Sequence, residues 1–155
     1  MIVDSTVLIS LANIGKIEII NQCLIPENVL KEIINEPAKS ALLTLKFQKV
    51  TPLKNSKLHS LSILGDKKET GDSDIVALLL DNPSSIIATD DKRLRNVCRA
   101  LGGKVTGTLG LLIYSVKNER FSKETALILL DKLNRTGFRT SIELYNRAKD
   151  KIEEI

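Results

Sequence analysis

Aromatic residues are scarce in this chain of 155 residues: they make up 3% of it, and there is no tryptophan. Proteins that bind single strands of nucleic acid without sequence preference stack the bases on aromatic side chains, so we do not expect that device to dominate here. Histidine occurs once, as His59, in a polar stretch that predicts a surface position. A mechanism that depends on a histidine general base is therefore not expected.

Cysteines and long apolar segments are also few. Cys23 and Cys98 match no metal-binding or redox spacing, and their apolar surroundings predict that both are buried as small hydrophobic side chains. No N-terminal segment resembles a signal peptide, and no apolar run approaches the roughly 20 residues needed to span a bilayer. We therefore expect a cytoplasmic protein with no membrane contact.

The remaining composition is that of an ordinary soluble globular protein, with 43% hydrophobic and 27% charged residues. The length suits one domain, which we expect to cover residues 1–155. The formal net charge of +4 is compatible with a polyanionic substrate, but a solvated surface explains it equally well.

Short apolar segments alternate with amphipathic ones along the chain. The predicted strands cover residues 1–3, 23–26, 49–51, 84–89 and 104–106. The predicted helices cover residues 7–12, 16–21, 27–36, 38–47, 71–82, 90–101, 109–117, 123–134 and 141–153, and residues 52–70 are polar and only weakly helical in pattern. Thr108 is expected to cap the helix that follows it. This order predicts a three-layer α/β/α sandwich with a mostly parallel five-stranded sheet and C-terminal helices from about residue 109 onward.

Acidic residues stand where apolar segments give way to turns or helices. Asp4 follows the first strand, and Asp90 and Asp91 follow the strand at residues 84–89. Asp72 opens a helix, and Glu32 lies within one. Because the carboxyl ends of parallel strands meet at one edge of a sheet, we expect these side chains to gather there. Carboxylates in such a group repel each other unless a hard divalent cation holds them.

Each acidic residue also has a purely structural explanation. An aspartate at a strand end or a helix start can cap the helix, where the dipole favours negative charge. Glu32 can lie on the solvated face of an amphipathic helix. Capping alone, however, uses Ser, Thr or Asn just as often as Asp, so the joint occurrence favours a site.

Carboxylate oxygens without histidine or cysteine suit Mg²⁺ or Mn²⁺, which also bind substrate phosphates. Such ions orient a water for in-line attack at phosphorus and offset the charge on the leaving oxygen. We expect Asp4, Asp72 and Asp91 to be ligands, with Glu32 holding a water. Ser5, Thr6 and Thr89 are expected to orient the carboxylates through hydrogen bonds. Lys92, Arg93 and Arg95 can meet flanking phosphates, or they can form a solvated helix face.

Four segments resemble, in order and spacing, the motifs of the PIN-domain family. They are Asp4-Ser5-Thr6-Val7-Leu8-Ile9, Val29-Leu30-Lys31-Glu32-Ile33, Gly71-Asp72-Ser73-Asp74-Ile75-Val76-Ala77 and Thr89-Asp90-Asp91-Lys92-Arg93-Leu94. From residue 100 onward the chain is similar to a prokaryotic subgroup of PIN-like proteins related to VapC toxins. The resemblance covers essentially the whole chain.

The resemblance implies a Mg²⁺- or Mn²⁺-dependent ribonuclease with a parallel sheet between helices, acting as the toxin of a toxin–antitoxin pair. It implies RNA as substrate, a cognate antitoxin protein and a homodimer as partners, and catalytic and metal-binding roles for Asp4, Glu32, Asp72 and Asp91. Two departures leave assignments open. The third motif usually carries Glu after its Gly, so Asp74 can share or take the role of Asp72. In the fourth motif either Asp90 or Asp91 can face the metal, although the spacing from Thr89 favours Asp91.

Other functions fit less well. A non-catalytic RNA- or protein-binding module with the same fold has no reason to keep all four acidic residues. A phosphorelay receiver domain needs an acidic pair after its first strand, where Asp4 stands alone, and an Asp after its third strand, which ends at Thr51. A phosphatase with an aspartyl nucleophile needs a second Asp two residues after the first, and Thr6 occupies that place.

Overall fold

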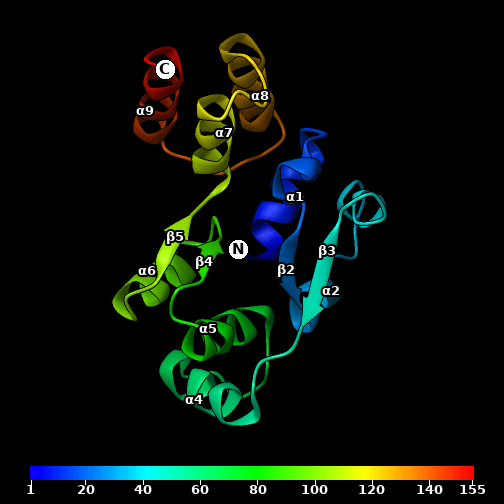
Figure 1. Ribbon diagram of the computed structural model, residues 1–155, viewed down its shortest axis with the longest axis vertical. Helices are drawn as coiled ribbons and strands as arrows, with labels where there is room; N and C mark the ends of the chain where they lie inside the picture. Colours follow the sequence, from blue (N-terminus) through cyan, green and yellow to red (C-terminus); the bar gives the residue numbers. More distant parts are fainter.

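The sheet at the centre of the protein is entirely parallel. The computed structural model describes residues 1–155, and its five strands are β1 (Ile2–Val3), β2 (Cys23–Pro26), β3 (Phe47–Val50), β4 (Ile86–Ala88) and β5 (Lys104–Thr106). They lie in the order β3-β2-β1-β4-β5, so β1 is the central strand (Figure 1). The predicted α/β/α sandwich with a parallel five-stranded sheet is confirmed.

The strand order reverses at β1, and this reversal positions the site. Connections leave β1 toward β2 and β3 on one side, and the chain then returns to place β4 on the other side of β1. Since such crossovers are right-handed, the helices that follow β1 and β3 cover opposite faces of the sheet. Ligand sites of open parallel sheets form at this reversal, outside the carboxyl ends of the strands. Asp4 follows β1 at this point.

The first half of the chain contributes short helices. They are α1 (Ser5–Asn13), a 3₁₀ helix η1 (Ile17–Ile20), α2 (Glu27–Glu32), α3 (Ala38–Ala41) and α4 (Lys54–Leu64). From residue 71 onward the helices are α5 (Gly71–Asp81), α6 (Lys92–Ala100), α7 (Thr108–Lys117), α8 (Lys123–Arg135) and α9 (Ile142–Glu153). In Figure 1 the strands occupy the middle of the molecule, with α4 and α5 below them and α7, α8 and α9 above.

The largest differences from the predicted segments lie between residues 27 and 51. The helix expected over residues 27–36 ends at Glu32, because Ile33 leaves the helical region (φ −86°, ψ 85°). The helix expected over residues 38–47 is shortened to the four residues of α3, and Phe47 already belongs to β3, which starts two residues earlier than predicted and ends at Val50. Proline disfavours the helical conformation in the residue before it, and Pro37 separates the two helices.

The polar segment over residues 52–70 contains a well-formed helix, α4. Its polar sequence gives little amphipathic signal, but tertiary contacts hold it in place. Asp81, at the end of α5, accepts hydrogen bonds from the Leu53 amide at 2.9 Å and from the Ser56 hydroxyl. Gly65 then ends the helix in the left-handed region at φ 71°, a conformation that glycine adopts without strain.

The main hydrophobic core lies around the sheet and includes 28 buried residues. A second, smaller cluster joins α7, α8 and α9 through Val116, Ala126, Leu130, Ala148 and Ile152. Three leucines of α8 are buried: Leu129, Leu130 and Leu133. Cys23 and Cys98 are buried free thiols, and His59 is exposed, as expected. None of the helices combines the length and the apolar character that a membrane span requires.

Candidate metal centre

Asp4 is buried, with 2% of its surface exposed. It follows the central strand, and its extended backbone makes it the N-cap of α1. Its Oδ1 accepts a hydrogen bond from the Ser5 amide at 2.8 Å. Its Oδ2 accepts bonds from the hydroxyls of Thr6 at 2.6 Å and Thr89 at 2.7 Å. These donors fix the orientation of the carboxylate.

Thr89 is close to Asp4 because of the strand register. Val3 of β1 pairs with Ala88 of β4, so the residues that follow them are neighbours at the carboxyl end of the sheet. The Asp4 amide donates to the Ala88 carbonyl at 2.9 Å. The parallel register thus brings together two residues that are 85 positions apart in the sequence.

Glu32 reaches the same place from the last residue of α2. Its Oε2 accepts a hydrogen bond from the Ser5 hydroxyl at 2.6 Å, and its Oε1 accepts one from the Gly71 amide at 2.9 Å. A Cβ atom on Gly71 would overlap the Glu32 carboxylate and would lie 2.9 Å from its Cδ. The glycine is therefore required by the close approach of Glu32 to the start of α5. The apolar pattern of α2 does not predict this contact, and its one signal in the sequence is the glycine directly before Asp72.

Asp72 lies in the first turn of α5 and is half-buried. The pKa of Asp72 is raised from 3.8 to about 6, chiefly by burial and in addition by the negative charges of Asp4, Asp91 and Glu32. Arg93 opposes this effect. Hydrogen bonds play no part in the shift, since the Asp72 carboxylate accepts none from the protein. The charges of the other three acidic residues therefore reach Asp72.

Asp91 caps α6 with one carboxylate oxygen. Its Oδ1 accepts a hydrogen bond from the Leu94 amide at 2.7 Å, and its own amide donates to the Thr89 hydroxyl at 3.1 Å. Thr89 thus links Asp4 with Asp91. The second oxygen of Asp91, Oδ2, accepts no hydrogen bond from the protein. The capping explanation and the site explanation consequently apply to the same residue through different oxygens.

The neighbouring Asp90 points the other way, toward α7. Its Oδ1 accepts a hydrogen bond from the Thr108 amide at 2.8 Å, and its Oδ2 accepts one from the Thr108 hydroxyl at 2.6 Å. Burial raises the pKa of Asp90, and these bonds oppose the rise. The expectation that Thr108 caps α7 is wrong: the N-cap residue is Gly107, and Asp90 supplies the acceptor.

Asp74 lies on a different side of α5. Its Oδ2 accepts a hydrogen bond from the Asn28 amide at 3.4 Å, at the start of α2, and its Oδ1 is buried with no partner. Burial raises the pKa of Asp74, and the nearest charges that act on it are Lys57 and Glu69. Asp4 and Asp91, whose charges act on Asp72, are not among the charges that act on Asp74.

The three basic residues expected near the site differ in the contacts that they make. The Arg93 side chain donates to the Leu64 carbonyl at 2.7 Å and contacts Asp66 at 3.4 Å. Arg95 donates through Nη1 to the carbonyls of Thr89 at 2.7 Å and Thr106 at 2.8 Å, which fastens the ends of β4 and β5. Lys92 is exposed and forms no ion pair. Of the three, only Lys92 is free of such contacts.

The donor set of this cluster fits a hard divalent cation. All four side chains present carboxylate oxygens, the ligands that Mg²⁺ and Mn²⁺ prefer, and Asp72 and Asp91 keep oxygens that no protein donor occupies. No three carboxylates are already arranged as metal ligands.

Comparison with known proteins assigns the chain to a family. A family profile described as a PIN domain matches residues 1–154. A search of curated protein sequences finds no match to the chain. The profile covers the sheet, the acidic cluster and the C-terminal helices. The chain therefore belongs to the PIN-domain family, whose fold is a nuclease fold.

Proposed function

We propose that this protein is a Mg²⁺- or Mn²⁺-dependent endoribonuclease that hydrolyses RNA phosphodiesters. The observation that carries the proposal is the Asp72 carboxylate, which is half-buried, accepts no hydrogen bond from the protein and lies in the field of Asp4, Asp91 and Glu32. A protein gains no stability from such an arrangement without a cation, because burial and like charge both disfavour the ionised form. Perturbed carboxyl pKa values in a cluster are typical of functional sites.

Asp4, Asp72 and Asp91 are the residues that would hold the metal. When bound, the ion supplies Lewis-acid activation of water and offsets negative charge on the phosphate. Asp91 suits this role better than Asp90, because both Asp90 oxygens already accept hydrogen bonds from Thr108. Asp72 suits it better than Asp74, because Asp74 is paired with the start of α2.

The remaining residues position these groups. Thr6 and Thr89 hold the Asp4 carboxylate from one side, and the Ser5 amide holds it from the other. Glu32 is fixed by Ser5 and Gly71, and its remaining lone pairs can hold the attacking water and accept its proton. Reaction at phosphorus depends on such fixed geometry, because the gain comes from orientation and electrostatic stabilisation.

We further propose that the protein is a toxin held by a cognate antitoxin and that it assembles as a homodimer. Only the resemblance to VapC-related proteins supports these two points. They predict that expression of the protein without its partner arrests growth.

The test is cleavage of a mixture of structured RNAs with Mg²⁺ or Mn²⁺, with EDTA, and with the variant Asp4→Asn. Asp131→Asn is the control, because Asp131 pairs only with Arg135 on the surface of α8. We expect metal-dependent cutting by the wild type and the control, and none by Asp4→Asn. If all three proteins are equally inert while the wild type still binds RNA or a protein, the non-catalytic binding module replaces the nuclease.

A further inference from the structure

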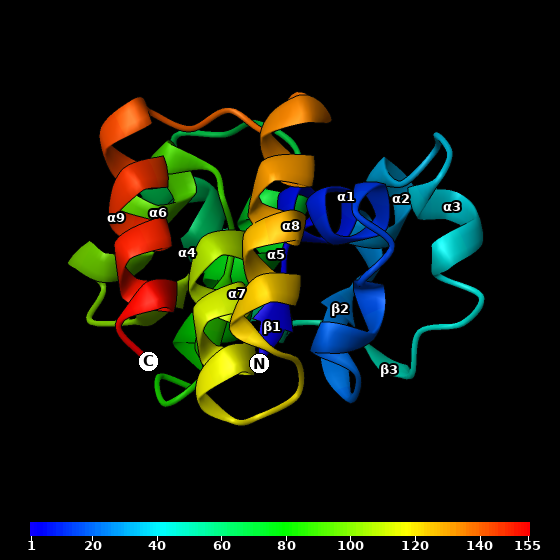
Figure 2. The same cartoon turned by 90° about the horizontal axis from the view of Figure 1, so that it is seen from above.

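A cleft of about 630 Å³ lies between α6 and α9, and its lining is strongly basic. The end of β5 and the start of α7 contribute to it through Thr106, Gly107 and Gly110. Figures 1 and 2 place α6 and α9 on the same side of the molecule, with α9 above α6. The six cationic residues of this cleft, here called the basic groove, are Lys92, Arg95, Arg99, Arg139, Arg147 and Lys151.

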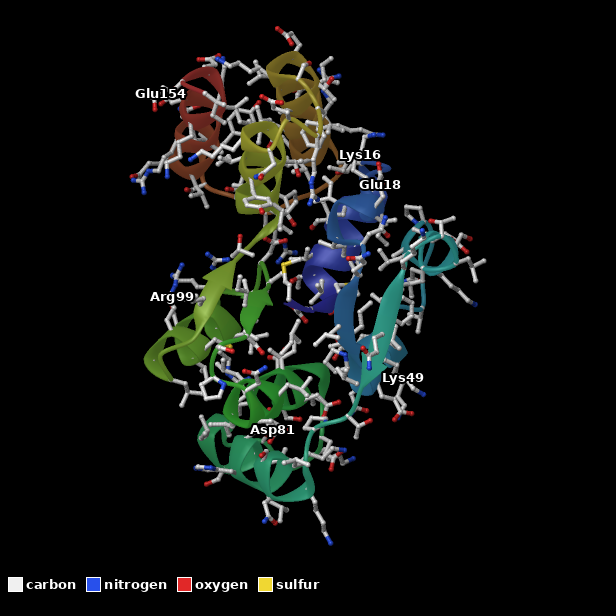
Figure 3. The ribbon with its side chains drawn as sticks, in the orientation of Figure 1. Lys16, Glu18, Lys49, Asp81, Arg99 and Glu154 are labelled. Atoms are coloured by element: carbon white, nitrogen blue, oxygen red, sulfur yellow. The ribbon has the colours of Figure 1, made fainter.

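The lining residues of the two helices follow the same spacing. On α6 they stand at Lys92, Arg95 and Arg99, three and four residues apart, which places them on one face of the helix. On α9 the lining residues Leu144, Arg147 and Lys151 repeat this spacing. Figure 3 shows Arg99 on the left side of the molecule, below the helix whose end is marked by Glu154. The cations therefore come from both walls of the groove.

The charge of the groove is not neutralised within the protein. Asp90 is the only carboxylate in the lining, and Thr108 occupies both its oxygens. Among the six cations only Arg147 forms an ion pair, with Glu143 of its own helix at 3.1 Å, and both side chains are exposed. Exposed pairs of this kind contribute little, so they do not hold the arginine against a better partner. Burial and the nearby charge of Arg99 lower the pKa of Arg95, and the charge of Asp90 opposes them.

The groove begins where the carboxylate cluster ends. Lys92 directly follows Asp91, the N-cap of α6. From Lys92 to Arg99 the helix extends about 10 Å, at about 1.5 Å per residue, away from the cluster. A polyanion lying along α6 would therefore have one end beside the candidate metal centre.

We propose that the basic groove binds the phosphate backbone of a single nucleic-acid strand that leads away from the carboxylate cluster. Arginine and lysine side chains from two walls suit a row of phosphates, which carry no sequence information. Phe138 is the only aromatic residue in the lining, so stacking of successive bases contributes little. Binding in the groove requires no metal. Its connection to cleavage, however, depends on the nuclease function proposed above.

The test uses the full-length protein in EDTA, so that binding is measured without cleavage. A fluorescent single-stranded RNA 12-mer is titrated at several salt concentrations and followed by anisotropy. The groove variant is Arg99→Gln with Lys151→Gln, which removes one unpaired cation from each wall. The matched control is Arg135→Gln with Lys49→Gln, which removes the same two residue types from exposed positions on α8 and β3. Thermal unfolding establishes that both variants are folded.

We expect the groove variant to lower the magnitude of the slope of log K against log salt by about 1.4, because each phosphate contact on a single strand contributes about 0.7. At 0.1 M salt this corresponds to an affinity loss of about 25-fold. The control should bind like the wild type. Equal losses in the two variants, or an unchanged slope in the groove variant, would overturn the proposal.

Two further probes separate the alternatives. An RNA duplex that binds as tightly, with the same loss in the groove variant, would overturn the assignment to a single strand. A polyglutamate peptide that binds through the groove when the RNA does not would assign it to an acidic protein segment instead. Groove-dependent RNA binding without any metal-dependent cleavage would leave this proposal standing and reject the nuclease. If the wild type cleaves RNA with metal but the groove variant binds RNA normally, the nuclease function stands and the groove proposal is rejected.

Discussion

The Ser5 hydroxyl donates a hydrogen bond to Glu32 Oε2 at 2.6 Å, across 27 positions of the sequence. This bond joins the first residue of α1 to the last residue of α2. Ser5 also donates its amide to Asp4, so one residue orients two carboxylates of the cluster. Neutral donors hold the two acids in place without removing their charge, and this leaves the charge available to a cation.

The variant Asp72→Asn should be more stable than the wild type at pH 7.5 in EDTA. In the folded wild type the pKa of the Asp72 carboxyl is raised from 3.8 to about 6. The folded state therefore binds a proton at Asp72 more tightly than the unfolded state does. The stability that protonation provides is complete below pH 3.8 and is lost as the pH rises through about 6. After allowance for solvent screening of a half-buried group, we expect a difference on the order of 1 kcal/mol.

Urea unfolding at pH 3.5 and pH 7.5 measures this difference. The two proteins should be nearly equal at the lower pH and diverge at the higher one. Saturating Mn²⁺ should reverse the order at pH 7.5, because the cation stabilises the wild type. A wild type that is already the more stable protein at pH 7.5 in EDTA would show that Asp72 does not lie in a repulsive field.

Gly71→Ala should destabilise the protein by about 1–3 kcal/mol, the usual cost of overpacking a filled site. The added Cβ overlaps the Glu32 carboxylate and lies 3.0 Å from Val29 Cγ2. A double-mutant cycle with Glu32→Ala identifies which contact matters. If Glu32 is the obstacle, the cost of Gly71→Ala falls clearly in the Glu32→Ala background. An unchanged cost would assign the clash to Val29.

Asp90 and Asp91 should respond differently to substitution. Asp91→Asn keeps a good N-cap for α6 but removes the charge, so stability should change little while the Mn²⁺-induced rise in Tm is lost. Asp90→Ala leaves the Thr108 amide and hydroxyl without their acceptor and should cost on the order of 1–3 kcal/mol. It should keep its Mn²⁺ response.

Thermal unfolding with and without Mn²⁺ distinguishes the two aspartates. The wild type should gain about 2.7 kcal/mol at a metal concentration of about 100 times Kd. The opposite pattern, in which Asp90→Ala loses the metal response and Asp91→Asn keeps it, would exchange the two assignments.

Much of this site follows from local sequence and strand pairing. Asp4 could be placed because a short β-branched strand ends there, and Thr89 because the run before it predicts another strand of the same parallel sheet. Parallel pairing then makes them neighbours, which the bond of 2.7 Å between their side chains confirms. Ser5 and Thr6 could be anticipated for the same reason, as polar residues directly after the strand.

Other parts depend on contacts that no local pattern reveals. Glu32 acquires its position because α2 ends early, whereas the apolar pattern continues through Ile33 and Ile34. The separation of Asp90 from Asp91 depends on the approach of Thr108 from α7. The basic groove needs α9 to lie opposite α6, and Arg139, Arg147 and Lys151 show no feature in the sequence that connects them to Arg99.

The most direct test is to measure the Mn²⁺ dependence of RNA cleavage beside Mn²⁺ binding by calorimetry, for the wild type and for Asp4→Asn. We predict that the midpoints of binding and cleavage coincide in the wild type and that Asp4→Asn loses both while remaining folded by circular dichroism. Cleavage that persists in EDTA, or an Asp4→Asn variant that binds Mn²⁺ and cuts RNA like the wild type, would contradict a catalytic metal centre at this cluster.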